Sequence, residues 1–314
     1  MKLQLGDGRH TLSVGAPPAF VTLPAVHPLG QGQLSLDVEL EHGLISRVST
    51  SFGDGHRGDE KLLEVRDYRQ GLSLINRHNW LTPVAAEIAY ALACEDLMGL
   101  VPPPRAVLLR ELLLALQNMT GLAQHLAGNS ADPAAWLEPR ERLVELTEAI
   151  TGARLHVSFI RLGGVAHDVD ADASERINHE IESLQWPELQ LMDFGWSPAN
   201  DEQFQAHHAL LSNFAEQVSA TLDHLNATPG AIDVTLPKVV RVPVGDSYKE
   251  CRATTGTVGV WLHSDGGKSP LRVALTSPSL LALGTWQATS RGKSLENALG
   301  DLFAMPLCYG EIER

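Results

Sequence analysis

The hydrophobic pattern of this 314-residue chain changes its period twice. In residues 1–56 apolar and polar residues alternate over short segments such as QLSLDVEL (33–40), which is typical of strands with one buried face. In residues 57–230 apolar residues recur every three to four positions, which predicts helices. In residues 231–314 short β-like segments return before a final helix. These three regions predict an α+β fold, with a central α-helical bundle between small N-terminal and C-terminal β regions.

Glycine and proline mark where the expected elements end. Helices are expected at 87–100, 104–128, 138–152 and 201–230, because each ends at a glycine or a Pro-Gly pair. Helices of this length favour a bundle. In the C-terminal region strands are expected at 232–236, 257–263 and 270–276, with SDGGKS as the turn between the last two, followed by a helix at 295–304.

Composition excludes several classes of protein. The cysteines, at 94, 251 and 308, form no C-x-x-C pair, which argues against a disulfide scaffold and against a self-contained zinc or iron–sulfur site. With 24 Lys+Arg and 38 Asp+Glu the net charge is −14, which disfavours nucleic acid as a partner. The first residues lack the pattern of a signal peptide, and the most apolar stretch, 106–116, is interrupted by Arg110 and Glu111. We therefore expect a cytoplasmic chain.

Three short motifs are weak indicators of chemistry. RLGGVAHD (161–168) lacks the G-x-G-x-x-G spacing of a phosphate loop. His263, Ser264 and Asp265 are the residue types of a hydrolase triad, but triad members converge from separate segments and a hairpin turn explains these residues. The histidines at 207, 208 and 224 complete no H-E-x-x-H pattern and are expected to be surface or packed residues.

Five blocks, in order, carry a family resemblance. They are HRGDEKLLEVRDYRQGLSLINRHNW (56–80), AYALACEDLMGLVPPPRAVLLRELLLALQNMTGLAQHL (89–126), PRERLVELTEAITGARLHVSFIRLGGVAHD (139–168), GTVGVWLHSDGGKSPLRVALTSPSL (256–280) and GEIER (310–314). Together they resemble the D subunit of respiratory complex I, the NADH-quinone oxidoreductase, a family related to the large subunit of membrane-bound [NiFe] hydrogenases. The resemblance runs from about residue 27 onward and is weak, in a shortened form, over 170–235. It implies a fold like that of the hydrogenase large subunit.

The resemblance also shows what this chain has lost relative to [NiFe] hydrogenases. Those enzymes hold their metals with two C-x-x-C pairs. At the matching positions this chain has Asn79 and Thr82, then Cys308 and Glu311. One thiolate out of four cannot make that site, so we expect no bound metal and no hydrogenase activity.

Members of the complex I family bind a quinone headgroup between a histidine of an H-P-x-x-H-G turn and a tyrosine of an R-x-D-Y segment. Here the turn reads HPLGQG, beginning at His27 with Gln31 in the second histidine position, and the segment reads RHNW, with Trp80 in place of the tyrosine. Neither replacement is a physiological proton donor. A supporting aspartate of the family corresponds to Asp132. The resemblance thus implies His27, Gln31, Trp80 and Asp132 as the residues of an acceptor cavity.

Arg57, Arg77 and His156 match family residues that lie near the terminal iron–sulfur cluster of a neighbouring subunit. Positive groups there would stabilise the reduced cluster and raise its potential. Alternatively, these residues pair with acidic groups at the subunit interface.

The resemblance implies a peripheral-arm subunit of a membrane-bound, ion-translocating oxidoreductase complex, related either to the D subunit of complex I or to energy-converting hydrogenases. Its partners would be an iron–sulfur small subunit with a 4Fe-4S cluster, other peripheral-arm subunits and antiporter-like membrane subunits. With the small subunit it would form a quinone-type acceptor cavity, binding no cofactor alone, at the inner face of the cell membrane. The alternative is a non-catalytic structural subunit with a degenerate site. A free-standing hydrolase using His263 or Ser264 is a third hypothesis.

Overall fold

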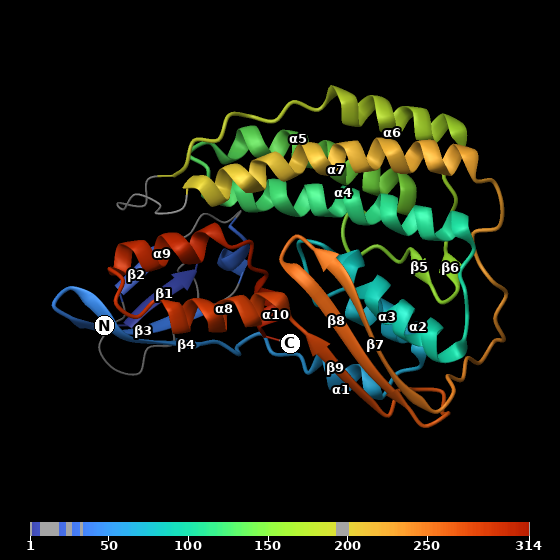
Figure 1. The fold of residues 1–314 in the computed structure, drawn as a ribbon, viewed down its shortest axis with the longest axis horizontal. Coiled ribbons are helices and arrows are strands. Elements are labelled where there is room, and N and C mark those ends of the chain that lie inside the picture. Colours follow the sequence, from blue (N-terminus) through green and yellow to red (C-terminus); the bar gives the residue numbers. More distant parts are fainter. Residues whose placement is uncertain (1, 7–18, 23–26, 32–33, 193–200, 314) are drawn as a thin grey trace.

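The computed structural model describes residues 2–6, 19–22, 27–31, 34–192 and 201–313. Figure 1 shows a layer of long helices along one side of the molecule. The two larger sheets of the described residues lie beneath this layer, one built near the N-terminus and one near the C-terminus, each with its own short helices. The predicted α+β fold, with a central helical bundle and two β regions, is confirmed.

In the described part of the chain the bundle is formed by α4 (Pro104–Asn129), α5 (Pro133–Thr151), α6 (Ala171–Ser183) and α7 (Asp201–Ala227). α4 packs against both α5 and α7, and α6 packs on α7. Proline at the first turn starts α4 and α5, and Gly152, with a φ of 77°, ends α5 in the left-handed conformation. By length and composition α4 could cross a membrane, but 72% of its most apolar window is buried inside the molecule, as expected of a core helix.

The C-terminal sheet is antiparallel, in the order β7 (Gly245–Ala253), β8 (Gly256–Ser264) and β9 (Arg272–Thr276). α3 (Pro83–Met98) lies on this sheet and is apolar around most of its circumference, because α4 covers part of its other side. The short helices α1 (Asp59–Glu64) and α2 (Tyr68–Ile75) precede α3 and complete this layer.

One expected strand does not form. Residues 232–236 contribute a single bond to a neighbouring strand, in which the carbonyl of Ile232 accepts from the backbone N–H of Val165 at 3.0 Å. Val165 belongs to β6 (Gly164–Val165), which is only two residues long and is already paired with β5 (Ile160–Arg161). The prediction of a strand at 232–236 was wrong because this neighbour is too short to support a ladder.

The N-terminal sheet has the order β2 (Ala19–Thr22), β1 (Lys2–Gly6), β3 (Leu34–Glu41) and β4 (Leu44–Ser51). On β3 every second residue is buried along its first half, as the alternation predicted. The apolar face of this sheet packs on helices from the other end of the sequence, α8 (Pro278–Thr289), α9 (Leu295–Ala304) and α10 (Tyr309–Ile312), in a separate hydrophobic core.

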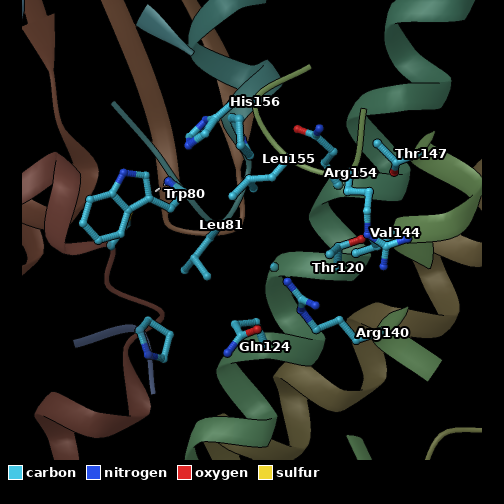
Figure 2. A pocket seen from close by; sticks show the side chains of 15 residues that line it. Trp80, Leu81, Thr120, Gln124, Arg140, Val144, Thr147, Arg154, Leu155 and His156 are labelled. Atoms are coloured by element: carbon cyan, nitrogen blue, oxygen red, sulfur yellow. Dashed lines mark hydrogen bonds between the residues drawn. The ribbon is translucent and has the colours of Figure 1, made fainter. Parts of the chain in front are cut away.

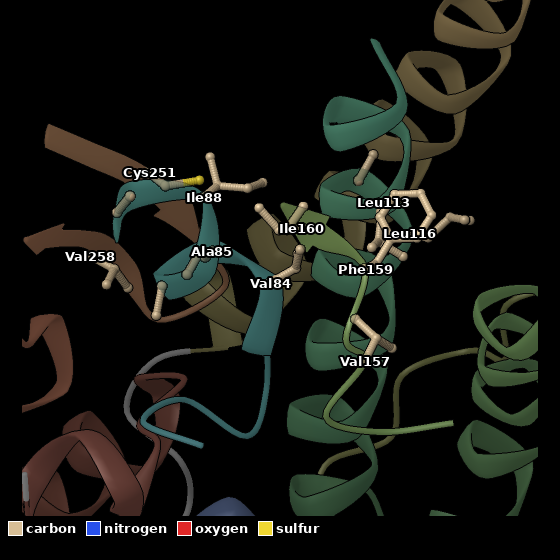
Figure 3. Close-up of a cluster of buried hydrophobic side chains, with 14 of the residues drawn as sticks. Val84, Ala85, Ile88, Leu113, Leu116, Val157, Phe159, Ile160, Cys251 and Val258 are labelled. Carbon is tan, nitrogen blue, oxygen red and sulfur yellow. The ribbon is translucent and has the colours of Figure 1, made fainter. Parts of the chain in front are cut away.

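The larger core joins the bundle to the C-terminal sheet. Figure 3 shows its centre, where side chains of α3, α4, β5, β7 and β8 meet. Two glycines let α4 approach its neighbours closely. A Cβ on Gly121 would lie 2.6 Å from the carbonyl oxygen of Leu81, and one on Gly128 would lie 2.7 Å from the Cα of His27. The loop around Leu81 and the turn at His27 are therefore both held against α4.

Candidate functional site

A cavity of about 320 Å³ opens where the loop around Trp80 faces α4 and α5 (Figure 2). Trp80 and Leu81 form one side, and Arg140, Val144 and Thr147 of α5 form the other. Its walls come from five segments: Pro28; Trp80, Leu81 and Pro83; Gln117, Thr120, Gly121 and Gln124; Arg140, Val144, Thr147, Arg154, Leu155 and His156; and Cys308.

Hydrogen bonds between side chains and backbone groups fix the loop that carries Trp80. The side-chain oxygen of Asn79 accepts from the N–H groups of Leu81 and Thr82, at 2.8 and 2.9 Å. The backbone N–H of Trp80 donates to the sulfur of Cys308 at 3.1 Å, and its indole N–H donates to the carbonyl of Arg77. Because the indole N–H is already engaged, Trp80 presents its ring rather than a donor to the cavity.

The four positions that correspond to the hydrogenase cysteines come together beside this loop. The side-chain amide of Asn79 donates to the carboxylate of Glu311 at 2.7 Å, and the hydroxyls of Thr82 and Thr254 bond at 2.9 Å. The sulfur of Cys308 accepts from the backbone N–H of Trp80. Burial raises the pKa of the Cys308 thiol to about 12. An amide, a hydroxyl, a neutral thiol and one carboxyl, each bonded to a protein group, do not fit a nickel–iron centre. That these positions bind no metal stays a prediction.

Glu311 is a fully buried carboxyl group with several donors. Asn79 and Thr255 donate to one of its oxygens, and the hydroxyl of Ser279 donates to the other. Burial raises its pKa, against the opposing effect of nearby His78 and of these bonds. His78, itself buried, lies 3.5 Å from Asp59 and bonds to Ser277. A polar network thus runs through the interior where a metal site would otherwise stand.

Of the three residues expected near a partner's cluster, the two arginines act electrostatically on the histidine. His156 has a φ of 53°, unusual for a residue with a side chain, and its Nδ1 lies 2.8 Å from the Asn76 side-chain oxygen. Burial lowers the pKa of His156, and the positive charges of Arg77 and Arg57 lower it further. Two charges from distant parts of the sequence therefore act on its ring. We call Arg57, Arg77 and His156 the cationic face.

Within the cationic face the arginines are held differently. The guanidinium of Arg57 donates to Asp59 at 2.8 Å and is 44% exposed, so this arginine pairs with an acid of its own chain. The guanidinium of Arg77 donates to the carbonyl of Ser73 and is exposed. Both remain accessible to a second molecule.

The four expected cavity residues are only partly brought together. Trp80 lines the cavity, and His27 lies beside it, next to Pro28 in the wall. Gln31 ends the 3-10 helix η1 (Pro28–Gln31), and its side chain is outside the described part of the chain. Asp132 is exposed and caps α5 by accepting from the N–H of Ala135, and it is not among the lining residues that the structure describes.

Comparison with known proteins decides the family. The sequence model for the respiratory-chain NADH dehydrogenase 49 kDa subunit matches residues 128–192 and 206–314, more than half of the chain. The chain belongs to this family. The D subunit of the NADH-quinone oxidoreductase of Rhodospirillum rubrum is 27% identical over a 376-residue alignment that covers 92% of this chain and 96% of that protein. The NADH-ubiquinone oxidoreductase 49 kDa subunit of Reclinomonas americana is 26% identical over an alignment that covers 92% of this chain and 95% of that protein.

This member of the 49 kDa subunit family also resembles a solved structure. A chain from the membrane-bound sulfane sulfur reductase, an archaeal respiratory membrane complex, superposes with a TM-score of 0.75 at 20% sequence identity. The superposition covers 90% of this chain and 94% of the other. At that identity the similarity establishes the fold. The resemblance to the D subunit of complex I expected from the sequence blocks is confirmed.

Several cavity residues of this family member were not anticipated. Arg140 and Arg154 both lie in the wall, together with the polar side chains of Gln117 and Gln124. In the sequence the arginines stand in a charged run, PRERLVELTEAITGAR, where solvated ion pairs are the ordinary expectation. The sequence offered one indication of the role of Arg154, which is that it stands only two positions before His156, a residue already expected at the site.

The hydrolase hypothesis has no support in the geometry. His263 bonds to Asp246 at 2.9 Å, while the Ser264 hydroxyl is buried and donates to the carbonyl of Val242. Neighbouring residues of a strand point to opposite faces, so His263 cannot activate Ser264. The expectation that the histidines at 207, 208 and 224 are surface or packed residues is confirmed. The rings of His207 and His208 lie 5.2 Å from His125 and 5.6 Å from Trp136, and His224 is exposed.

Proposed function

We propose that this chain is a peripheral-arm subunit of a membrane-bound, ion-translocating oxidoreductase complex, on the cytoplasmic side of the membrane. It would bind an iron–sulfur small subunit at the cationic face and form with it the cavity in which an electron acceptor of quinone type is reduced. Other peripheral-arm subunits and antiporter-like membrane subunits would complete the assembly. The 4Fe-4S cluster would be held by the small subunit.

One observation carries this proposal: His156 belongs both to the cationic face and to the wall of the cavity. The surface at which a partner's cluster would dock is therefore continuous with the space in which an acceptor would bind. When bound nearby, the partner's cluster supplies electrons. The residues of this chain would contribute positive charge beside it, which favours the reduced form of the cluster.

The wall supports binding and orientation more than proton delivery. The Trp80 ring and Leu81 offer a flat apolar surface, and Gln117 and Thr120 offer hydrogen-bonding groups elsewhere in the wall. His156, the titratable imidazole in the wall, has a lowered pKa and is neutral near pH 7. We infer that protons needed for reduction reach the acceptor by a route other than Trp80, whose N–H remains bonded to Arg77.

The proposal is tested by expressing the full chain with its iron–sulfur small subunit and analysing what copurifies. We expect the small subunit and antiporter-like membrane proteins, with iron from the partner and no stoichiometric nickel. In that complex Arg57→Ala and Arg77→Ala should each lower the midpoint potential of the cluster, on the order of tens of millivolts. Arg47→Ala, which removes an exposed arginine of β4, is the matched control. Unchanged potentials and unchanged electron transfer to every tested acceptor would show that the redox role is wrong.

A second candidate is a structural subunit that joins the small subunit to the membrane arm without reacting itself. The observation in its favour is that the four positions matching the hydrogenase cysteines are bonded to protein groups and bind one another in part. In that case the partners would still copurify, but the cavity variant Leu81→Trp, which fills the space, would leave electron transfer unchanged. If the redox role is correct, the same variant slows acceptor reduction.

A further inference from the structure

The wall of the cavity is positively charged in a chain whose net charge is −14. The positive charge comes from Arg140 and Arg154, which both line the cavity. None of the lining residues in the described part of the chain is an Asp or a Glu. A concave site with cations and no carboxylate has a positive potential, which favours anions.

Arg140 is the less compensated of the two arginines. Its Nε is buried and has no hydrogen-bond partner, and its guanidinium lies 3.8 Å from Glu141, which is long for an ion pair. Burial lowers the pKa of Arg140, and the charge of Arg154 lowers it further. Its side chain is only 26% exposed and reaches from α5 toward Gln124 at the floor of the cavity in Figure 2.

Arg154 also lines the cavity, but its guanidinium is held by carboxylates that are not among the lining residues. Its guanidinium bonds to Glu141 and Glu148, and both of these carboxylates are nearly half exposed, outside the cavity wall. These bonds fix the orientation of Arg154 while its remaining face contributes to the lining. The pair therefore combines a fixed cation with a second cation that lacks a close counter-charge.

Another arginine of α5 shows what full pairing looks like in this bundle. Arg142 donates to Glu180 at 2.6 Å and to the hydroxyl of Ser183 at 2.6 Å, and it lies away from the cavity. A partly buried guanidinium normally finds such partners, because an uncompensated charge is costly to desolvate. Arg140, which lines the cavity, lacks such close partners, whereas Arg142 on the same helix has them.

We propose that the cavity binds an acceptor that carries a negative charge, with its anionic group against Arg140 and Arg154 and its flat apolar part against Trp80 and Leu81. This inference rests on the proposed function for the identity of the ligand as an electron acceptor, and it narrows the class of that acceptor. A carboxylate or another oxyanion would complete the hydrogen bonding of Arg140 through two parallel bonds. A neutral carbonyl ligand would accept a hydrogen bond there but would leave the charge of the pair uncompensated.

The test compares benzoate with benzamide, which have nearly the same shape and differ in charge. Binding of each to the purified full chain is measured by ligand-observed NMR titration at fixed ionic strength. We expect benzoate to bind about tenfold more tightly than benzamide, as one charge-assisted hydrogen-bonded pair provides. Arg140→Gln should remove this preference, Arg140→Lys should keep part of it, and the matched control Arg142→Gln should keep all of it. Circular dichroism confirms that each variant is folded.

Equal binding of the two probes, a preference that survives in Arg140→Gln, or no binding of either probe to the unmodified chain would overturn the inference. The titration needs neither the partner subunit nor electrons. If benzoate is preferred but no iron–sulfur subunit copurifies, the anion site is supported and the proposed function is refuted. If the subunit copurifies but benzoate is not preferred, the proposed function is supported and the anion site is refuted.

Discussion

Replacement of His27 should flatten the pH dependence of stability at mildly acidic pH. His27 is 2% exposed, its Nδ1 accepts from the backbone N–H of Leu29 at 3.1 Å, and its ring packs edge-on against Phe303. Burial lowers its pKa from 6.5 to about 4. Between these values the unfolded chain binds a proton that the folded chain does not, so the stability present above pH 6.5 is lost as the pH falls toward 4.

At 1.36 kcal/mol per pKa unit, this lowering corresponds to about 3 kcal/mol for His27 between pH 6.5 and 4. Burial also lowers the pKa of neighbouring His125, which adds to the acid sensitivity in the same direction. His27→Asn keeps an oxygen that can accept from Leu29 and removes the titrating ring.

The assay is urea unfolding, followed by circular dichroism, at pH 7.5 and at pH 4.5. Because pH 4.5 lies about two units below the unfolded pKa of 6.5, the free energy of unfolding of His27→Asn should fall by about 2 to 3 kcal/mol less over this interval than that of the unmodified chain. His42→Asn is the matched control, since it removes an exposed imidazole at a turn with a φ of 53° that asparagine tolerates. If the free energy of unfolding fell equally in His27→Asn and in the unmodified chain, the assignment of a neutral, buried His27 would be refuted.

Three further outcomes are expected. Glu95→Ala should lower the free energy of unfolding by about 3 to 5 kcal/mol in a denaturant titration. The reason is that the buried guanidinium of Arg110, which lies 2.6 Å from the Glu95 carboxylate, would lose this counter-charge. A loss below about 1 kcal/mol would contradict this. Gly121→Ala should lower it by about 1 to 3 kcal/mol and weaken probe binding, since the new Cβ would displace the Leu81 loop; unchanged values for both would argue against the close approach. The Cys308 thiol should react with a disulfide reagent only after unfolding, because burial raises its pKa to about 12, and rapid labelling of the native chain would disprove this.

The sequence predicted well those elements that have a clear period and clear ends. α4 was expected at 104–128 and spans Pro104–Asn129, because proline opens it and an apolar stripe runs along it. α8 was not anticipated. It is apolar at most positions, with glycine, serine and threonine between them, so no polar stripe marks it as a helix. β7 was missed for the related reason that its GDSYKECRA sequence is mostly polar on the exposed side.

For the site, family resemblance supplied what local pattern could not. Nothing in the spacing of Arg57, Arg77 and His156 indicates that the charges of the two arginines act on the histidine ring, which is a result of tertiary packing. Neither the family resemblance nor the local sequence pattern indicated Arg140. Along the sequence it belongs to a run of alternating charges, and only the absence of a close carboxylate in the described structure distinguishes it from Arg142.

The second hydrophobic core has a consequence for how the chain is made. The strands β3 and β4 are synthesised early, but the helices that bury their apolar face, α8 to α10, begin some 230 residues later. At about 5 to 20 residues per second, the ribosome leaves this face uncovered for roughly 10 to 50 s. During that time Leu34, Leu36 and Val38 lack the helices that bury them in the folded chain. The second core therefore cannot close until the last helices of the chain have been synthesised.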